Sequence, residues 1–451
     1  MSSFRYVLLW SDALFFALIA VATGGLWWAR GQDHLRQAWR RVAASRSGMA
    51  AATVLAAFLV VGLLDSLHYR PRLDGGREAY AVEVLSAFDA LMMPLKANTE
   101  KTYSAPLATH LYAKETLEGE GGATQLRDYP RLKYGGAHLR DDLGRHDADV
   151  AQAALRGLGL GFAVWCAAWL AVAGLRRRWP HAAWGAALAA LLAVCLLAGP
   201  AAVLAQGYHV FGTDKVGQDV FYLALKSIRT GILIGTLTTL IMLPAAVLLG
   251  ILAGYVGGWV DDVIQYLYTT LNSIPGVLLI AAAVLMMQVI IDTHPGWFAT
   301  SAERADARLL ALCAILGVTS WTGLCRLLRG ETLKLREMEY VQAAQAFGVP
   351  RIGIMLRHIL PNVMHIVLIA VVMDFSGLVL AEAVLSYVGI GVDPNTISFG
   401  TMINTARMEL AREPMVWWSL AAAFCFMFAL VLAANLFADV VRDAFDPRGH
   451  R

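Results

Sequence analysis

Hydrophobic residues fall into long blocks along most of the chain, and shorter polar stretches separate these blocks. A membrane-spanning helix needs roughly 20 apolar residues to cross the hydrocarbon core of a bilayer. None of the blocks alternates apolar and polar residues as a membrane β-strand does, and the strands of a soluble enzyme are much shorter. The pattern therefore predicts an all-α, polytopic helical membrane protein with about nine transmembrane helices. The nine blocks are 7–28, 48–65, 154–174, 181–206, 229–256, 274–292, 307–325, 362–386 and 415–439.

Composition supports a membrane protein and argues against other classes. Of the 451 residues, 58% are hydrophobic and 16% are charged, whereas soluble proteins carry about 25% charged residues. A disordered chain needs low hydrophobicity and high net charge. The net charge is only +3, from 37 basic and 34 acidic residues. That balance argues against a protein that binds nucleic acid through a concentrated basic surface.

The first block could be a secretory signal peptide, but its flanks favour a retained span. Only Arg5 precedes it, and it ends in Trp27, Trp28 and Arg30. Tryptophan and arginine at the end of an apolar stretch are typical of an anchor at the membrane interface, not of a cleavage site.

Basic residues are concentrated in four segments, which are 29–47, 174–181, 326–358 and the C-terminal tail. Nine spans place all four segments on the same side of the membrane. Because short loops rich in Lys and Arg stay in the cytoplasm, we expect the N-terminus outside and the C-terminus in the cytoplasm.

The polar segment 66–153 then lies outside as an insert between two spans. Its stretch 80–95 has the pattern of an amphipathic helix lying on the membrane or packed on the spans. Two further external stretches are 207–228 and 387–413. The chain accordingly divides into an N-terminal membrane extension, 1–206, and a second membrane domain, 207–451.

Neither histidines nor cysteines have the spacing of a metal site, and we expect none. The insert contains His68, His110, His138 and His146. The cysteines lie in or at the edge of apolar blocks, without a C-x-x-C pair, and are expected to be small buried hydrophobic residues. They are Cys166, Cys195, Cys313, Cys325 and Cys425.

The cytoplasmic segment at about 331–361 carries the strongest local signal, a helix, a break and a second helix. Gly348 stands where a helix C-terminal cap is expected, and Pro350 suits the first turn of the next helix. Pro361 marks the entry into the following span. The second helix has apolar residues at helical spacing, and small residues precede the break, so the hairpin could lie in a groove of a partner. An ordinary interfacial loop is the alternative. The apolar residues are Ile352, Met355, Leu356 and Ile359, and the small ones are Ala343, Ala344 and Ala346.

This segment resembles the EAA loop of ABC-importer permeases, in which Glu-Ala-Ala is followed by a glycine and then by Leu-Pro. The matching residues are Ala343, Ala344, Gly348, Leu360 and Pro361. The Glu position is occupied by Gln342, which removes one charge available to a partner but keeps a similar helix propensity.

The resemblance extends over 209–448 and is to the dipeptide/oligopeptide branch of these permeases, to its second (C-type) subunit. That branch carries a GTD-x-x-GRD element before a span. The corresponding residues here are Gly212, Thr213, Asp214, Gly217 and Asp219. Gln218 stands where arginine is usual. The stretches 254–261, 382–389 and 442–447 are also similar to the family, whereas residues up to about 200 match less well.

The resemblance implies a six-helix-type permease core, extended here by extra N-terminal helices, in a bacterial cytoplasmic membrane. It implies a heterodimer with a second permease, two cytoplasmic ABC ATPases docked on the coupling loops, and a periplasmic or extracellular solute-binding protein that delivers the peptide. The chain is then not an enzyme and binds no cofactor, since ATP-Mg is bound by the ATPases. Consistently, no Gly-Lys dipeptide, which a P-loop requires, occurs in the sequence.

Three residues inside predicted spans attract attention. Asp374 and Glu382 are acids in the eighth span, and such residues usually face a cavity or a partner. Each could line the translocation path or a subunit interface. The alternative for Asp374 is an acid whose charge is satisfied locally, and the alternative for Glu382 is a structural hydrogen bond. Pro244 is expected to kink the fifth span or to mark a hinge.

Two other functional classes remain as alternatives. A stand-alone secondary transporter or channel is expected to show broken helices or inverted repeats, and neither is evident. A membrane-embedded enzyme would need a motif such as H-E-x-x-H or G-x-S-x-G, and neither occurs. Nothing in the spans selects one peptide or small solute over another.

Overall fold

The computed structural model describes most of the chain in two compact units. Unit 1 comprises Met1–Leu8, Arg40–Gly231 and Thr396–Leu436, and unit 2 comprises Leu9–Trp39, Ile232–Asn395 and Phe437–Arg451. The described residues are 4–29, 31–72, 80–118, 125–139, 142–298 and 300–445.

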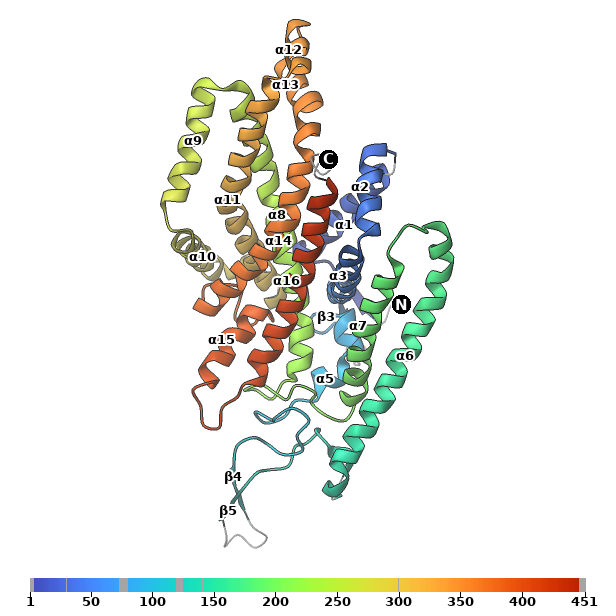
Figure 1. The fold of residues 1–451 in the computed structure, drawn as a ribbon. Coiled ribbons are helices and arrows are strands. Elements are labelled where there is room, and N and C mark those ends of the chain that lie inside the picture. Colours follow the sequence, from blue (N-terminus) through green and yellow to red (C-terminus); the bar gives the residue numbers. More distant parts are fainter. Residues whose placement is uncertain are drawn as a thin grey trace. The chain divides into compact units, whose positions relative to one another are not determined.

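Helices dominate both units, as predicted (Figure 1). Eight helices among the described residues are long and apolar enough to cross a membrane. The ninth predicted span corresponds to α1 (Trp10–Ala29), in which the apolar described stretch Trp10–Gly25 is shorter than the other eight. The eight are α3 (Arg46–Asp65), α6 (His146–Arg178), α7 (Trp184–Leu204), α8 (Val220–Val256), α10 (Gly276–Thr293), α11 (Ser301–Arg336), α14 (Leu360–Val388) and α16 (Trp418–Phe445).

In unit 1, α6 and α7 form a tightly packed helical hairpin. A Cβ added at Gly157 would lie 2.6 Å from the backbone nitrogen of Pro200, and one added at Gly161 would lie 2.9 Å from the carbonyl carbon of Cys195. Small residues spaced by four let two membrane helices approach closely. The hairpin also packs on α3.

The insert of unit 1 contains short strands as well as helices. Strand β2 pairs antiparallel with β1 and β3, and β4 pairs with β5. The strands are β1 (Phe4–Val7), β2 (His68–Pro71), β3 (Leu85–Ser86), β4 (Glu115–Glu118) and β5 (Gln125–Asp128). The 3₁₀ turns η1 (Ala137–Leu139) and η2 (Leu143–Arg145) lead into α6.

The predicted amphipathic helix over 80–95 is wrong in its first half. Residues 85–86 form strand β3, and α4 (Ala87–Leu91) begins only after a capping box between Ser86 and Asp89. Pro94, which has no backbone N–H to continue a helix, lies in the first turn of a separate helix, α5 (Met93–Ala97).

In unit 2, α8 continues as one helix through Pro244. Beyond it, α8 packs closely on α11: Cβ atoms at Gly250 and Gly254 would lie 2.9 Å and 2.7 Å from the carbonyl oxygens of Cys325 and Arg329. Left-handed Gly257 and Gly258 then join α8 to α9 (Gly258–Ser273). At the start of α1, the backbone N–H of Ser11 donates to Asp306 Oδ2 at 3.1 Å.

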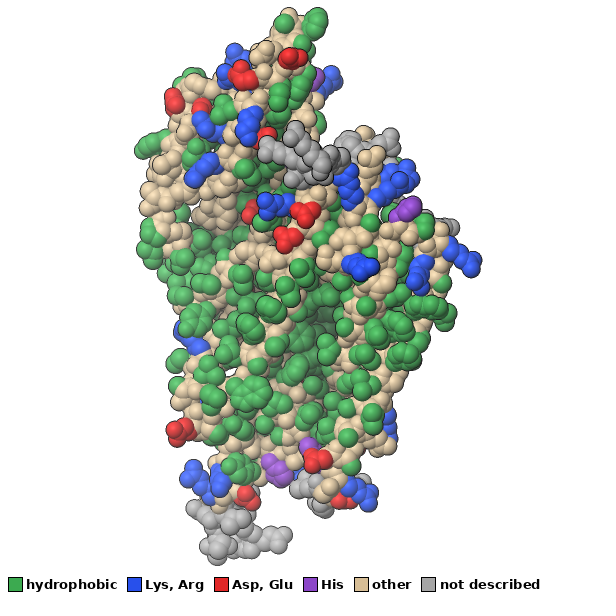
Figure 2. All heavy atoms as spheres, viewed as in Figure 1, with side chains coloured by type: hydrophobic (Ala, Val, Ile, Leu, Met, Phe, Trp, Pro, Cys, Tyr) green, Lys and Arg blue, Asp and Glu red, His purple; other side chains and the backbone are tan. Residues whose placement is uncertain are grey.

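The remaining elements are α2 (Asp33–Ala44), α12 (Glu339–Ala346), α13 (Arg351–Ile354), the π-helical turn η4 (Met355–Ile359), α15 (Phe399–Glu409) and the 3₁₀ turn η3 (Pro295–Trp297). In unit 2, charged side chains gather over α12, α13 and the adjoining ends of α9 and α11, whereas hydrophobic side chains cover α10 (Figure 2).

The cysteines are all free, and the expectation of burial holds for three of the five. Cys195, Cys313 and Cys325 are buried, Cys166 is half-buried, and Cys425 is exposed on α16, which contradicts the expectation for that residue. Among the residues that the structure describes, no group of His, Cys, Asp and Glu could hold a metal ion.

Candidate functional site

The segment 339–359, which the resemblance predicts to contact an ATPase, folds as two helices with a left-handed break, in the order that the sequence predicts. Helix α12 ends at Ala346, and Gly348 follows with φ +74°. The N–H of Val349 donates to the carbonyl of Ala344 at 3.1 Å, which closes the helix end. Pro350 is the N-cap of α13, one position earlier than predicted.

Beyond α13, the chain enters the membrane helix without a break. Helix α13, the π turn and α14 form one helical run, Arg351–Val388. The N–H of Leu360 reaches back to the carbonyl of Met355, as in a π turn, directly before Pro361. Since proline has no N–H and its ring crowds the preceding turn, the wider turn accommodates Pro361 inside a continuous helix.

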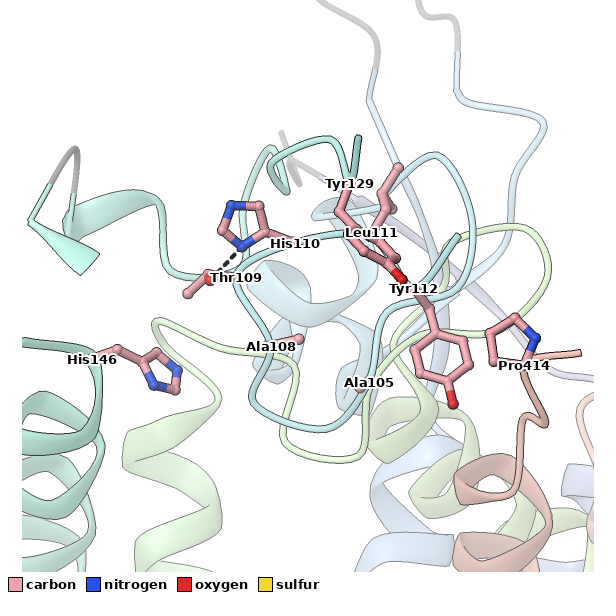
Figure 3. A pocket seen from close by; sticks show the side chains of 9 residues that line it. All are labelled: Ala105, Ala108, Thr109, His110, Leu111, Tyr112, Tyr129, His146 and Pro414. Atoms are coloured by element: carbon pink, nitrogen blue, oxygen red, sulfur yellow. Dashed lines mark hydrogen bonds between the residues drawn. The ribbon is translucent and has the colours of Figure 1, made fainter. Parts of the chain in front are cut away.

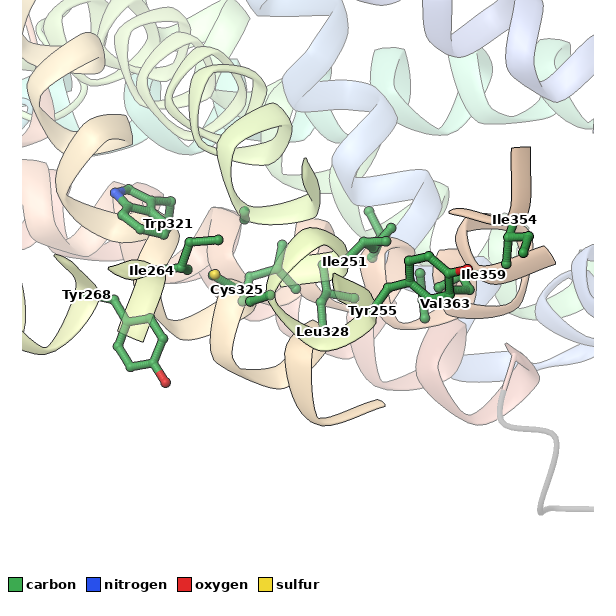
Figure 4. Close-up of a cluster of buried hydrophobic side chains, with 14 of the residues drawn as sticks. Ile251, Tyr255, Ile264, Tyr268, Trp321, Cys325, Leu328, Ile354, Ile359 and Val363 are labelled. Atoms are coloured by element: carbon green, nitrogen blue, oxygen red, sulfur yellow. The ribbon is translucent and has the colours of Figure 1, made fainter. Parts of the chain in front are cut away.

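One face of the hairpin is buried in the core of unit 2. Val341, Ile354 and Ile359 belong to a hydrophobic cluster with α8 and α11, and in Figure 4 the Tyr255 ring lies next to Ile359. Ala344 is also in this cluster and only 8% exposed. It packs within its own chain, whereas Ala343 and Ala346 are exposed.

The opposite face is apolar and uncovered. Phe347, at the tip, is 88% exposed, and Ile352 and Leu356 are 67% and 54% exposed. Gln342 is exposed too, and its side-chain amide donates to the carbonyl of Glu337 at 3.3 Å. The apolar positions of the second helix are thus divided between the core and a surface that no described residue covers.

A bidentate ion pair that no local sequence pattern predicts joins the helices next to this region. Arg329 Nε and Nη2 donate to the two carboxylate oxygens of Asp261 at 2.5 Å and 2.6 Å. These hydrogen bonds hold the pKa of Asp261 below its usual range. The pair joins α9 to α11, and a periodicity argument contains no signal for it because the residues are far apart in sequence.

The GTD element binds the insert of its own chain. Thr213 is buried, its N–H donates to the carbonyl of Ser104 at 3.1 Å, and its hydroxyl accepts the N–H of Ser104 at 2.7 Å. Gly212 and Gly217 have φ values of +68° and +78°. A Cβ at either position would collide with the carbonyl of Ser104 or of Glu100. Only glycine allows both the conformation and the approach.

The two aspartates of the element organise its backbone. Asp214 Oδ1 accepts the N–H groups of Val216 and Gln218 at 3.0 Å and 2.8 Å. Asp219 Oδ1 accepts the N–H of Tyr222 at 3.1 Å, so it caps the N-terminus of α8. Each of the five motif residues therefore has a structural explanation.

A buried charge cluster fastens the insert to this element. His209 Nδ1 lies 2.7 Å from Asp219 Oδ2, and His209 Nε2 lies 3.5 Å from Glu100 Oε1, an ion-pair distance. Burial would lower the pKa of His209, but its two carboxylate partners outweigh burial and raise that pKa to about 9. Glu100 also accepts N–H groups at 2.7–3.0 Å from Lys133, Tyr134 and Gly135.

The pKa of Glu100 is also set by burial against its polar partners, but here burial raises the pKa and the partners lower it. Burial favours the neutral acid, but the nearby His209 and the hydrogen bonds from three backbone N–H groups lower the pKa of Glu100 to about 2. No local sequence pattern indicates Glu100, because it lies 109 positions before His209 in the chain.

A second charge cluster joins the insert to the first turns of α8. Lys226 Nζ contacts Asp65 Oδ1 at 3.1 Å and also pairs with Asp89. The Tyr222 hydroxyl donates to Asp89 at 2.6 Å, and the Ser86 hydroxyl donates to Asp65 at 2.6 Å. Burial raises the pKa of Asp89, but Lys226 outweighs this and lowers it to about 2.

A cavity of about 430 Å³ lies within unit 1 and is open on one side. In Figure 3, His110 and His146 lie toward one end of it, and Tyr112 and Pro414 toward the other. None of the predicted site residues lines it. Its lining consists of Ala105, Ala108, Thr109, His110, Leu111, Tyr112, Tyr129, His146 and Pro414.

The two acids of α14 have different surroundings. Glu382 is buried, accepts the Ser386 hydroxyl at 2.7 Å, and has further interactions. Asp374 is half-buried and has neither a hydrogen-bond partner nor an ion-pair partner among the residues described. The geometry thus supports the structural interpretation for Glu382 and leaves Asp374 as the candidate for contact with a substrate or partner.

Comparison with known proteins identifies the family. Residues 246–451 match the family described as binding-protein-dependent transport system inner membrane component. The oligopeptide transport system permease protein OppC of Haemophilus influenzae is 30% identical over 248 residues, which are 55% of this chain and 73% of that protein.

Two further relatives agree. The dipeptide transport system permease protein DppC of Bacillus subtilis is 29% identical over 243 residues, 54% of this chain and 70% of DppC. The glutathione transport system permease protein GsiD of Pectobacterium atrosepticum is 31% identical over 242 residues, 53% of this chain and 73% of GsiD. Together with the helical fold, these matches show that the chain belongs to the family of inner membrane permease components of binding-protein-dependent ABC transporters.

Proposed function

We propose that the chain is one of two permease subunits in an ATP-driven importer, which carries di- or oligopeptides or related small solutes across the cytoplasmic membrane. The relatives named above are permeases for oligopeptides, dipeptides and glutathione. These solutes share peptide chemistry, which supports the substrate class.

The single observation that carries this function is the two-sided coupling hairpin. One face is anchored in the core of unit 2, and the other exposes Phe347, Ile352 and Leu356. Exposed apolar clusters of this kind mark protein–protein contacts. Because the hairpin is continuous with α14, a partner that moves it also moves a membrane helix, which is what alternating access requires.

The partners follow from this role. A cytoplasmic ABC ATPase covers the hairpin, and a second ATPase serves the other permease of the heterodimer. ATP-Mg is bound and hydrolysed in these subunits, and an external solute-binding protein delivers the peptide. The spans contribute a transient cavity, and half-buried Asp374 lies on the translocation path or at the interface with the second permease.

The proposed orientation has the N-terminus outside and the coupling hairpin and C-terminus in the cytoplasm. Strand β1, before α1, pairs with β2, which follows α3. The chain between these strands must therefore leave and return to the same side. This supports α1 and α3 as an antiparallel pair of crossings and a total of nine spans.

The test is co-purification of the ATPase with variants of the full chain. Phe347→Asp is expected to weaken ATPase retention about tenfold or more, because a desolvated aromatic anchor typically contributes that much. Val216→Asp is the matched control, since Val216 is 63% exposed but belongs to the external element. Equal retention by both variants would contradict the proposal. Uptake by the purified chain alone, without ATP, would favour a stand-alone transporter.

A further inference from the structure

The N-terminal extension carries a group of arginines that lie in two stretches of sequence without acidic residues. Neither 34–64 nor 150–213 contains a single Asp or Glu. These two segments supply α7 and most of the membrane helices α3 and α6, whose acids Asp65, Asp147 and Asp149 lie at the opposite ends of the helices. Carboxylates that could neutralise basic residues at this end of the helices are therefore missing from the segments themselves.

The fold brings the arginines of two separate loops together. The N–H of Ala183, between α6 and α7, donates to the carbonyl of Ala43, in the last turn of α2 before α3, at 2.8 Å. This bond places the two junctions side by side within unit 1. The basic residues that they carry there are Arg40, Arg41, Arg46, Arg176, Arg177 and His181.

Several of these side chains are exposed and unneutralised. Arg40, Arg46 and Arg177 are exposed and have no ion-pair partner in the described part of the chain. In Figure 2, basic side chains gather over the connected ends of α6 and α7, with hydrophobic side chains along the helices below them.

Tryptophans occur at the same level. The Arg176 guanidinium lies 5.8 Å from the centre of the Trp169 ring, and the Trp184 indole donates to the carbonyl of Trp179 at 2.9 Å. Tryptophan is enriched at the headgroup level of membranes, and basic clusters next to membrane helices attract anionic lipids. Arginines next to tryptophans are therefore the combination expected at the level of the lipid phosphate groups.

We propose that the joined α2–α3 and α6–α7 junctions form a binding surface for the headgroups of anionic phospholipids. Guanidinium groups match phosphate through paired N–H donors. The phosphate charge replaces the carboxylates that these segments lack. This surface lies outside residues 246–451, which match the permease family, so it adds a lipid contact to the extension and does not depend on peptide transport.

The test uses the purified full chain in nanodiscs of equal parts phosphatidylglycerol and phosphatidylcholine, with native mass spectrometry of the lipids retained after partial delipidation. The unmodified chain is expected to retain phosphatidylglycerol preferentially. The triple variant Arg40→Gln, Arg46→Gln, Arg177→Gln is expected to bind it about a hundredfold more weakly, since each basic residue near an anionic surface contributes about tenfold or somewhat less.

The matched control replaces the same three arginines by lysine, which keeps the charge, and is expected to retain most of the preference. Equal retention of the two lipids by the unmodified chain overturns the proposal without any variant. Undiminished phosphatidylglycerol retention by the glutamine variant overturns it as well. No ATPase or peptide is needed, so a failure here is distinct from a failure of the proposed transport function.

Discussion

At the scale of single residues, Asp374 and Glu382 are two carboxylic acids on one helix with different surroundings. Both are acids on α14, but the structure satisfies Glu382 with Ser386 and other groups and leaves Asp374 without a partner among the described residues. An acid inside a membrane helix is costly unless it is paired or faces water. This difference is the basis for the roles proposed for them, a structural role for Glu382 and contact with a substrate or partner for Asp374.

We expect Asp374→Asn to lower peptide uptake and to leave thermal stability nearly unchanged. Glu382→Ala is expected to lower the free energy of unfolding by about 1–3 kcal/mol, because it removes the acceptor of a buried hydroxyl. Uptake assays and thermal melts of the two variants check this. Unchanged uptake with Asp374→Asn would remove that residue from the mechanism.

Two glycines allow the cost of a left-handed conformation to be separated from the cost of a steric clash. Gly348 has φ +74°, and a Cβ there would have nothing within 4 Å, whereas a Cβ at Gly217 would collide with Glu100. Gly348→Ala is expected to cost roughly 1 kcal/mol, the strain alone. Gly217→Ala should cost distinctly more, and equal shifts in melting temperature would contradict the close approach of the insert.

At the scale of elements, the coupling hairpin combines a buried and an exposed face within one turn of α12. The sequence predicts its helix, break and helix correctly, because glycine and proline act locally. It does not reveal which alanine faces the core, since that depends on α8 and α11. The motif residues Ala343 and Ala344 therefore have different roles in the structure, one exposed and one buried.

Glutamate substitutions at these two positions are expected to act differently. Ala344→Glu places a charge in the core and should make the hairpin susceptible to limited proteolysis. Ala343→Glu should leave the proteolysis pattern unchanged and reduce retention of the ATPase. Identical proteolysis of both variants would show that Ala344 does not anchor the hairpin.

The buried charge cluster of Glu100, His209 and Asp219 makes the docking of the insert depend on pH in a defined way. The pKa of His209 is raised from 6.5 to about 9, so its contribution is complete below pH 6.5 and is lost as pH rises through about 9. The pKa of Glu100 is lowered from 4.5 to about 2, so its contribution is complete above pH 4.5 and is lost as pH falls through about 2. Docking of the insert is therefore strongest between pH 4.5 and pH 6.5, where both contributions are complete.

Hydrogen exchange of the amides of 133–135, corrected for the intrinsic rate, measures this docking, because these amides donate to Glu100. We expect protection to fall above pH 9. In the His209→Gln variant we expect weaker protection than in the unmodified chain already below pH 9, and no further fall near pH 9. A substitution of exposed His181 should change neither.

At the scale of the whole molecule, predictability follows the distance between interacting residues. The spans, the hairpin and the family resemblance rest on patterns within some 20 residues, and the sequence predicts them. The docking of the insert rests on pairs such as Ser104 with Thr213 and Asp65 with Lys226, which are more than 100 residues apart. Local patterns contain no information about such pairs, which explains why the insert was the least predictable part.

Labelling from the two sides of the membrane checks the proposed topology. A cysteine introduced at Val216 is expected to react with an impermeant reagent in intact cells, and one at Ala346 only after the membrane is opened. Exposed native Cys425 is replaced in both variants. The reverse pattern would invert the orientation and remove the hairpin from the cytoplasm.

The close contact of Gly250 and Gly254 with α11 has a consequence for how unit 2 can change shape. Backbones that touch leave no layer of side chains to slide or repack between them. Helices α8 and α11 must then turn together as a single stiff body at this level. Rotation is concentrated at nearby joints, and Gly257 and Gly258, both with positive φ, supply one between α8 and α9. A bulky residue at either glycine of this joint would restrict turnover without touching a substrate or a nucleotide.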